Sequence, residues 1–260
     1  MATTLAISGK GGSGKTTLAA MIIRLLLHRR NKAVLAVDAD PNSCLGLTMG
    51  VKPLGTIAEI REQARSKSPS SSGMTRVQSF EYGIQQAITE ADGFDLLTMG
   101  RPEGPDCYCA VNNLLRQFLD KLSSAYDFVV IDNEAGMEHL SRRTTNNVDF
   151  LCIVAEPTPL GAVTAKRISD LAEQLPISVK KIGVIWNRAE SAKQLSGIET
   201  FGCIPFDESV FNASMQSKTI FDLEENSPAF LAMQKILEHI LVPGSPQTMN
   251  NEQRTIFGGL

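Results

Sequence analysis

The amino-acid sequence predicts an α/β fold, with a mostly parallel central sheet and helices on both of its faces. Short apolar runs alternate with amphipathic segments of helix length along the chain. The runs are nearly continuous in Val, Ile and Leu, as in strands that are covered on both faces. Alternation of this kind favours parallel strands joined by right-handed crossovers, with ligands bound beyond the carboxyl ends of the strands.

The expected elements follow in order along the chain. Strands are expected over residues 3–8, 33–38, 94–99, 127–132, 150–156, 181–187 and 200–205. Apolar residues at helical spacing predict helices over 16–30, 112–125, 162–175 and 227–241. The Ser, Gly and Pro content of 66–76 indicates a loop inserted within the domain. We expect one domain over 1–242 and a C-terminal tail over 243–260, because Pro and Gly interrupt regular structure after residue 242.

The composition is that of a globular protein. The 260 residues include 43% hydrophobic and 20% charged residues, and the formal net charge is −3. A negative balance does not favour nucleic acid or an anionic membrane as a partner. The first residues lack a secretory signal pattern, and no apolar stretch reaches the roughly 20 residues that a membrane span requires. We therefore expect a cytoplasmic protein with no nucleic-acid partner and no membrane partner.

Residues 9–16, GKGGSGKT, follow an expected strand and open an expected helix. They match the phosphate-binding pattern GxxxxGK[ST], in which backbone N–H groups converge on phosphate oxygens at a helix N-terminus. Lys15 is expected to reach the β- and γ-phosphates, and the Thr16 hydroxyl to ligate magnesium. A Gly-rich turn without a ligand is the alternative, but the strand–loop–helix context argues against it. The sequence thus predicts an ATPase that binds ATP or ADP with Mg²⁺. The expected loop contacts are Gly9, Lys10, Gly11, Gly12, Ser13, Gly14, Lys15, Thr16 and Thr17.

A second lysine inside the loop, Lys10, is not required by that pattern. With it, the run KGGSGKT resembles the signature of the deviant Walker A ATPases, the MinD/ParA-type proteins of the SIMIBI class. In that family the extra lysine contacts nucleotide across a face-to-face homodimer. The resemblance therefore implies a homodimer, and a catalytic role for Lys10 beside Lys15. A solvated surface lysine is the alternative.

The same resemblance implies roles for residues at later strand ends. Asp40, in VDADP, matches the aspartate that positions the attacking water and is the third expected catalytic residue. Asp132, in VVIDNEAG, is expected to hold magnesium through water, and Gly136 to let the backbone approach the γ-phosphate. Two further segments resemble the parts of the family that read and cover adenine. Their residues here are Asn187, Arg188 and Pro205.

Cys107 and Cys109 lie two residues apart, so both sulfur atoms point to one side of an extended segment. A disulfide across so small a ring would be strained, and two thiolates are too few for a closed zinc or nickel site. A two-fold axis would bring four sulfur atoms together, in agreement with the homodimer implied by Lys10. The CxC motif alone is weak, and a chance pair of cysteines is the alternative.

The segments 38–46, 100–115 and 135–144 together resemble the CooC-type accessory ATPases. These serve nickel insertion into carbon monoxide dehydrogenase, and close relatives serve acetyl-CoA synthase. The resemblance implies a metallochaperone in which Cys107 and Cys109 hold Ni²⁺, or Zn²⁺, across the dimer. Its client would be carbon monoxide dehydrogenase or acetyl-CoA synthase. One departure is Asn133-Glu134 after Asp132, where neighbouring family members vary, and it leaves the client enzyme open.

Two other functions remain open from the sequence. A MinD/ParA-type positioning ATPase would call for a basic surface or a basic C-terminal helix, whereas 227–241 carries charges of both signs. An electron-transfer ATPase could hold a [4Fe–4S] cluster between two CxC pairs, although 133–140 lacks the cysteine found after the corresponding strand of nitrogenase reductases. The remaining candidate ligands are expected to be packing residues. They are Cys44, His139, Cys152 and Cys203.

Overall fold

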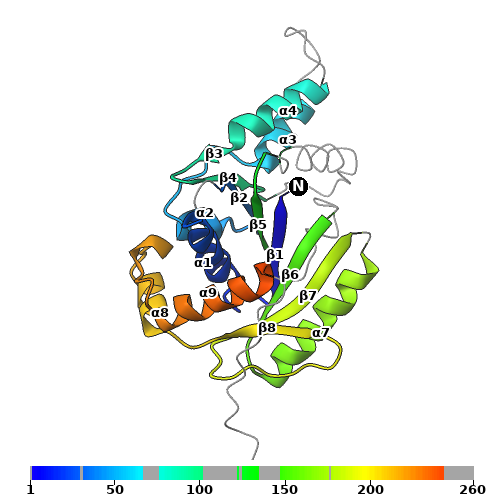
Figure 1. Ribbon diagram of the computed structural model, residues 1–260. Coiled ribbons are helices and arrows are strands. Elements are labelled where there is room, and N and C mark those ends of the chain that lie inside the picture. The colour runs from blue at the N-terminus through cyan, green and yellow to red at the C-terminus, as the bar shows by residue number, and fades with distance from the viewer. Residues whose placement is uncertain are drawn as a thin grey trace, which may run out of the picture.

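The computed structural model describes residues 2–29, 32–66, 76–101, 122, 125–134, 147–175 and 177–242. An eight-stranded sheet runs through the molecule in the order β3-β4-β2-β5-β1-β6-β7-β8 (Figure 1). Neighbouring strands are parallel, except that β3 and β4 are antiparallel. The predicted α/β fold is therefore confirmed. The strands are β1 (Thr3–Gly9), β2 (Val34–Ala39), β3 (Thr89–Glu90), β4 (Phe94–Thr98), β5 (Phe128–Asn133), β6 (Asn147–Ala155), β7 (Ser178–Asn187) and β8 (Glu199–Ile204).

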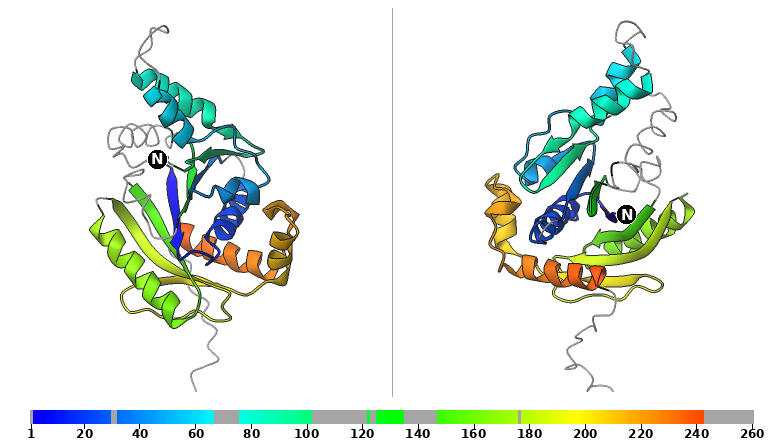
Figure 2. Two further views of the ribbon diagram at one scale, coloured as in Figure 1. Left: turned by 180° about the vertical axis from the view of Figure 1, so that it is seen from behind. Right: turned by 45° about the horizontal axis from the view of Figure 1, so that its top comes forward.

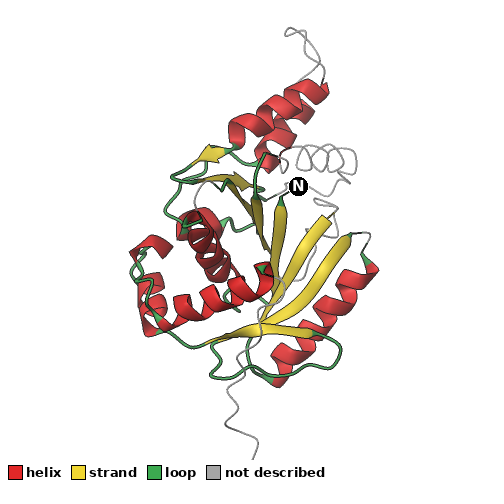
Figure 3. Ribbon diagram, viewed as in Figure 1, coloured by secondary structure: helices red, strands yellow, loops and turns green. Residues whose placement is uncertain are grey.

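Helices cover both faces of the sheet (Figures 2 and 3). Alternate strand residues serve the two layers, so that Leu5 and Ile7 join one hydrophobic cluster and Ala6 the other. The first layer contains α1 (Lys15–Leu27), α2 (Cys44–Thr48), α8 (Glu208–Met215), the 3-10 helix η1 (Ile220–Asp222) and α9 (Pro228–Leu241). The second contains α3 (Ile57–Ser66), α4 (Arg76–Ala87) and α7 (Pro159–Gln174).

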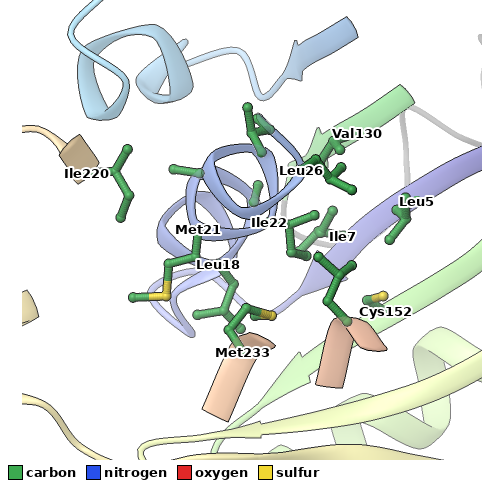
Figure 4. Packing of buried hydrophobic residues seen from close by; sticks show 14 of the residues in the cluster. Leu5, Ile7, Leu18, Met21, Ile22, Leu26, Val130, Cys152, Ile220 and Met233 are labelled. Atoms are coloured by element: carbon green, nitrogen blue, oxygen red, sulfur yellow. The ribbon is translucent and has the colours of Figure 1, made fainter. Parts of the chain in front are cut away.

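Helix α1, which begins at the end of the glycine-rich loop, is enclosed on most sides. It packs between the sheet and α9, with Ile22 beside Ile7 of β1 and Leu18 near Met233 of α9 (Figure 4). These side chains are at most 2% exposed. Because protein interiors are close-packed, α1 has little freedom to shift, and it gives the loop a rigid base.

The sheet opens between β1 and β5 at its carboxyl edge. These strands pair only as far as Ile7 and Asp132. Beyond that row β1 continues along β6, where Gly9 is level with Val154, while β5 continues along β2. From β1 the chain crosses to β2 on one side of this opening, and from β5 it crosses to β6 on the other. Such a switch in direction leaves a crevice at strand carboxyl ends, which is where ligands bind in open α/β sheets.

The structure adds elements that the sequence did not predict. The additions are β3, α2, α3, α4, α8 and the 3-10 helix η1. The first two span two and five residues, too short for a periodic signal. Helices α3 and α4 extend to Ser66 and Arg76, at both ends of the expected loop 66–76. Of the helix expected over 112–125, only Leu122 and Ala125 belong to the described residues. The tail expected over 243–260 lies outside them.

A buried arginine joins α1 to the C-terminal part of the chain. Arg24 is 8% exposed, and its guanidinium donates to the carbonyl oxygens of Ile220 and Leu223, the latter at 2.8 Å. A second nitrogen lies 3.2 Å from a carboxylate oxygen of Glu225, and the guanidinium carbon is 4.8 Å from the ring centroid of Phe230. The guanidinium thus satisfies several acceptors at once from nitrogens that are held in a fixed, planar geometry.

We expect Arg24→Met to lower the free energy of unfolding by about 2–4 kcal/mol. Methionine replaces the apolar stem of arginine, but it leaves the two carbonyl groups without a donor. Urea denaturation monitored by circular dichroism would measure this. Lys235→Met on the exposed side of α9 is the control and should change stability by less than about 0.5 kcal/mol. Equal stability of the two variants would contradict the role given to Arg24.

Candidate nucleotide site

The glycine-rich loop joins β1 to α1 at the open edge of the sheet. Its first and last glycines adopt positive φ angles, 156° at Gly9 and 98° at Gly14. A Cβ atom on Gly9 would lie 2.3 Å from the Val154 carbonyl oxygen, and one on Gly14 would lie 2.3 Å from the side-chain nitrogen of Asn187. Both positions therefore require glycine, because the neighbouring strands β6 and β7 press directly on the loop backbone.

The start of α1 presents N–H groups without a side-chain acceptor. Its N-cap residue, Gly14, has no side chain, and the first turn contains no acidic residue. The first N–H groups of a helix have no partner within the helix, and the helix dipole favours an anion beside them. Lys15 is 7% exposed, and its ammonium nitrogen lies 3.3 Å from the Lys10 carbonyl oxygen. The loop thus turns N–H groups and a lysine toward one place, a suitable arrangement for phosphate.

Two buried carboxylates lie side by side next to this loop. Asp38 and Asp132 are level on adjacent strands and are 0% exposed. Burial raises the pKa of Asp132 to about 7, with Asp38 adding to the shift, while the Thr16 hydroxyl and Lys15 oppose it. Neither oxygen of Asp132 has a partner in hydrogen-bond geometry among the described residues, although the Thr16 hydroxyl is close enough to lower the pKa of Asp132. A buried carboxylate in that condition is unfavourable unless a cation is near, so Asp132 together with Thr16 fits Mg²⁺.

Asp38 organises the turn that follows β2. Its two oxygens accept hydrogen bonds from the backbone N–H of Leu45 at 2.9 Å and of Asp40 at 3.3 Å. Burial raises its pKa to about 6, against the effect of these bonds. Asp40 itself is half-buried, and one of its oxygens accepts from the backbone and side-chain nitrogens of Asn42, each at 2.8 Å. Asp38 belongs to the motif VDADP, but the sequence alone indicated no role for it.

Asn187, which was expected to contact the adenine base, contacts the glycine-rich loop. Asn187 is 7% exposed, and its side-chain nitrogen donates to the Ser13 carbonyl oxygen at 2.7 Å. Its side-chain oxygen accepts from the Arg188 N–H at 3.0 Å. The guanidinium of Arg188 pairs with Glu156 at 2.7 Å. The amide of Asn187 therefore fastens the loop to the end of β7, a contact that the motif did not reveal.

Cavities flank the loop on two sides. One of about 100 Å³ lies between α1, the end of β7 and the segment after β8. Its walls include Thr17, Asn187, Pro205 and Phe206. The other, of about 400 Å³, lies between the loop and the start of α7, where Lys10 and Glu156 contribute opposite charges. The structure thus brings Arg188 and Pro205, expected near the base, to the first cavity and Lys10 to the second.

The expected transition-metal ligands Cys107 and Cys109 lie outside the described residues, as do Gly136 and His139. Within the part of the chain that is described, no three His, Cys, Asp or Glu residues are grouped to hold a metal ion. The described cysteines are Cys44, Cys152 and Cys203.

Cys152 is buried, with the pKa of its thiol raised to about 12, and Cys203 is half-buried, as expected of packing residues. Cys44 is exposed, so the expectation that it packs was wrong. Its position at the first turn of the short helix α2 turns it to solvent. Burial of part of the side chain and the nearby carboxylates of Asp38 and Asp40 raise the pKa of its thiol, which disfavours a thiolate ligand.

We expect Asp132→Asn to stabilise the nucleotide-free protein at pH 8. The folded state holds a proton on Asp132 up to about pH 7, whereas the unfolded chain releases it near 3.8. Stability of the natural protein therefore falls as pH rises between these values, and the amide avoids that loss. The gain should be about 2–4 kcal/mol at pH 8 and vanish near pH 4.

Urea unfolding at a series of pH values, without nucleotide or divalent cations, measures this difference. Asp92→Asn, at an exposed aspartate, is the control and should leave the pH dependence unchanged. Identical profiles for Asp132→Asn and the natural protein would show that the carboxylate is not destabilised by burial.

Comparisons with known proteins agree with the geometry of the site. Residues 4–220 match the family described as CbiA, the CobQ/CobB/MinD/ParA nucleotide binding domain. An uncharacterized ATP-binding protein of Methanocaldococcus jannaschii is 39% identical over 249 residues, covering 91% of this chain and 98% of the relative. The carbon monoxide dehydrogenase accessory protein CooC of Rhodospirillum rubrum is 31% identical over 260 residues, covering 91% and 97%.

Solved structures share the fold. The MinD cell division protein of Aquifex aeolicus superposes with a TM-score of 0.67 at 22% sequence identity, covering 94% of this chain and 99% of that chain. No helix among the described residues is long and apolar enough to cross a membrane. The family match extends over most of the sequence and includes the glycine-rich loop, the carboxylates at the ends of β2 and β5, and the end of β7. The chain therefore belongs to the CobQ/CobB/MinD/ParA nucleotide binding domain family of P-loop ATP-binding proteins.

Proposed function

We propose that this protein is an ATP-hydrolysing metallochaperone of the cytoplasm that supports nickel insertion into carbon monoxide dehydrogenase or acetyl-CoA synthase. The observation that carries the proposal is the CxC pair, Cys107 and Cys109, in a chain 31% identical over nearly its full length to a carbon monoxide dehydrogenase accessory protein. The fold alone does not select this cargo, because MinD/ParA-like proteins share the same architecture.

ATP binding begins at the loop that joins β1 to α1. The N–H groups of residues 9–17 surround the phosphates, and the Lys15 ammonium exchanges the Lys10 carbonyl oxygen for phosphate oxygens. The Thr16 hydroxyl and the Asp132 carboxylate would hold magnesium, Asp132 through water. A bound magnesium ion supplies positive charge that offsets the charge of the phosphates in the transition state. Asn187, Arg188 and Pro205 border the cavity proposed for the base.

Hydrolysis requires a water molecule aligned with the terminal phosphorus atom. Asp40 orients that water and accepts its proton as the new P–O bond forms and the bond to ADP breaks. The hydrogen bonds from the backbone N–H groups of the turn to Asp38, and from Asn42 to Asp40, restrict where the Asp40 carboxylate can point. Lys10, on the exposed side of the loop, reaches the nucleotide of a second copy in a homodimer and stabilises the leaving charge there.

The metal ion is the cargo of this cycle. Two copies contribute Cys107 and Cys109, and four thiolates satisfy the soft ligand preference of Ni²⁺ or Zn²⁺. ATP brings the copies together and hydrolysis separates them, so that metal affinity differs between the two states. Nucleotide and metal must then change each other's affinity by the same factor, since the coupling is reciprocal.

A cluster carrier is the second candidate. The cytosolic Fe-S cluster assembly factor nubp2 of Xenopus laevis is 25% identical over 283 residues, covering 94% of this chain and of the relative. The same four thiolates would serve a [4Fe–4S] cluster. Anaerobically prepared protein would be brown, with a broad absorption band in the visible range, if this candidate were correct. A colourless protein that binds nickel would favour the metallochaperone.

We expect Asp40→Ala to bind ATP with nearly unchanged affinity and to hydrolyse it about 10²–10⁴-fold more slowly, because water orientation and proton acceptance are lost. Phosphate release and fluorescent-nucleotide titration measure the two effects. Asp92→Ala, at an exposed aspartate, should match the natural protein in both assays. Unchanged turnover in Asp40→Ala would show that Asp40 takes no part in hydrolysis.

We expect the double variant Cys107→Ser, Cys109→Ser to lose stoichiometric Ni²⁺ and Zn²⁺ binding while still binding ATP. Serine hydroxyls are not thiolates, and they are poor ligands for these metals. Equilibrium dialysis with metal analysis tests this in the presence and absence of ATP. The control is Cys44→Ser, at the exposed cysteine, which should retain the metal. Undiminished metal binding in the double variant would defeat the metallochaperone proposal.

A further inference from the structure

The amide of Asn133 bridges the opening between β1 and β5. The ladder between these strands ends at Ile7 and Asp132. One residue further, the side-chain nitrogen of Asn133 donates to the Ile7 carbonyl oxygen at 3.0 Å. Beyond this point the two strands follow different neighbours, β6 and β2. The side chain thus supplies a hydrogen bond between β1 and β5 where the backbone pairing has stopped.

The buried surroundings of Asn133 indicate that its side chain is there for the hydrogen bond to the Ile7 carbonyl oxygen. Its side chain is 0% exposed, and its oxygen has no hydrogen-bond partner among the described residues. A buried amide with one unpaired end is less favourable than an apolar side chain of the same size. Packing alone therefore gives no reason for an amide at this position. The bond to the Ile7 carbonyl is the interaction that an apolar side chain could not replace.

The bridge joins the two strands, β5 and β1, that lead to the two parts of the proposed magnesium site. Asp132 immediately precedes Asn133 on β5, and its carboxylate points to the opposite face of the sheet, toward α1. The Thr16 hydroxyl belongs to the first turn of α1, and β1 leads into that helix through the loop. The distance between Asp132 and Thr16 therefore depends on how closely β5 is held to β1.

We propose that Asn133 is a positioning residue for the divalent cation of the ATP site. By holding the end of β5 against β1, it keeps the Asp132 carboxylate in reach of a cation that Thr16 also binds. This inference rests on the proposed role of Asp132 and Thr16. Groups that orient metal ligands from the outside typically change metal affinity by about 10–100-fold when removed.

The test is a titration of Mn²⁺, followed by electron paramagnetic resonance, into protein saturated with a slowly hydrolysed ATP analogue. Asn133→Leu preserves volume and lacks the donor, and we expect it to weaken Mn²⁺ binding by about 10-fold or more. Binding of the nucleotide without divalent cation, measured separately, should change less than about two-fold, because the loop itself is untouched. A purely structural role would alter both affinities together through the folded fraction.

The matched control is Ser8→Ala. Ser8 is also 0% exposed, lies on β1 one residue beyond Ile7, and its hydroxyl has no hydrogen-bond partner among the described residues. Its removal should leave Mn²⁺ affinity unchanged. If Asn133→Leu does not fold, Asn133→Ala replaces it in the same Mn²⁺ titration. Mn²⁺ affinity in the Asn133 variant equal to that of Ser8→Ala would overturn the positioning role.

Asp132→Ala separates this inference from the function on which it rests. If Asp132→Ala weakens Mn²⁺ binding while Asn133→Leu does not, only the role of Asn133 fails. If neither Asp132→Ala nor Asn133→Leu changes it, the proposed magnesium site fails and the positioning role fails with it. Loss of Mn²⁺ affinity in both variants, with nucleotide affinity kept, supports the two roles together.

Discussion

The unpaired carboxylate of Asp132 is the constraint around which the site is arranged. It is fully buried at the carboxyl edge of the sheet, and its pKa is raised to about 7 because burial disfavours the charge. The fold keeps this group beside a second buried carboxylate, Asp38, and close to the start of α1. A folded protein tolerates such an arrangement when binding relieves it. Lys15 offsets only part of the effect of burial, and a cation beside Asp132 would supply further positive charge.

The shape of the glycine-rich loop beside Asp132 depends on contacts with the neighbouring strands β6 and β7. Gly9 lies directly against the backbone of β6, and Gly14 against the side chain of Asn187 on β7. The amide of Asn187 also holds the Ser13 carbonyl oxygen. The N–H groups of the loop are thus held in place before any phosphate arrives. Preorganised donors of this kind avoid the reorganisation that a flexible loop would require on binding.

The described residues form most of the nucleotide-binding domain, and this domain is what the chain shares with its family. An ATP-binding relative, a carbon monoxide dehydrogenase accessory protein and a MinD cell division protein all match most of the chain. Proteins of one fold can therefore serve different outputs, so the cargo that we propose rests on residues outside the nucleotide site. For the proposed function these residues are Cys107 and Cys109, which lie outside the described residues.

The sequence by itself determined the fold class, the succession of the main strands along the chain and the position of the phosphate-binding loop. Each depends on local signals: continuous apolar runs for strands covered on both faces, and glycines spaced around a lysine where a strand meets a helix. Short elements such as β3 and α2 escaped prediction because they contain too few residues for a periodic pattern.

Only the tertiary structure decided which side chains act on one another across the sheet. Asp38 and Asp132 are 94 positions apart in numbering yet level on adjacent strands, which is why the charge of Asp38 adds to the raised pKa of Asp132. Asn187 meets the loop, and Asn133 bridges β5 to β1, through hydrogen bonds between residues more than 120 positions apart. Such contacts depend on strand order and register, and these arise from packing of the whole chain and not from any local pattern.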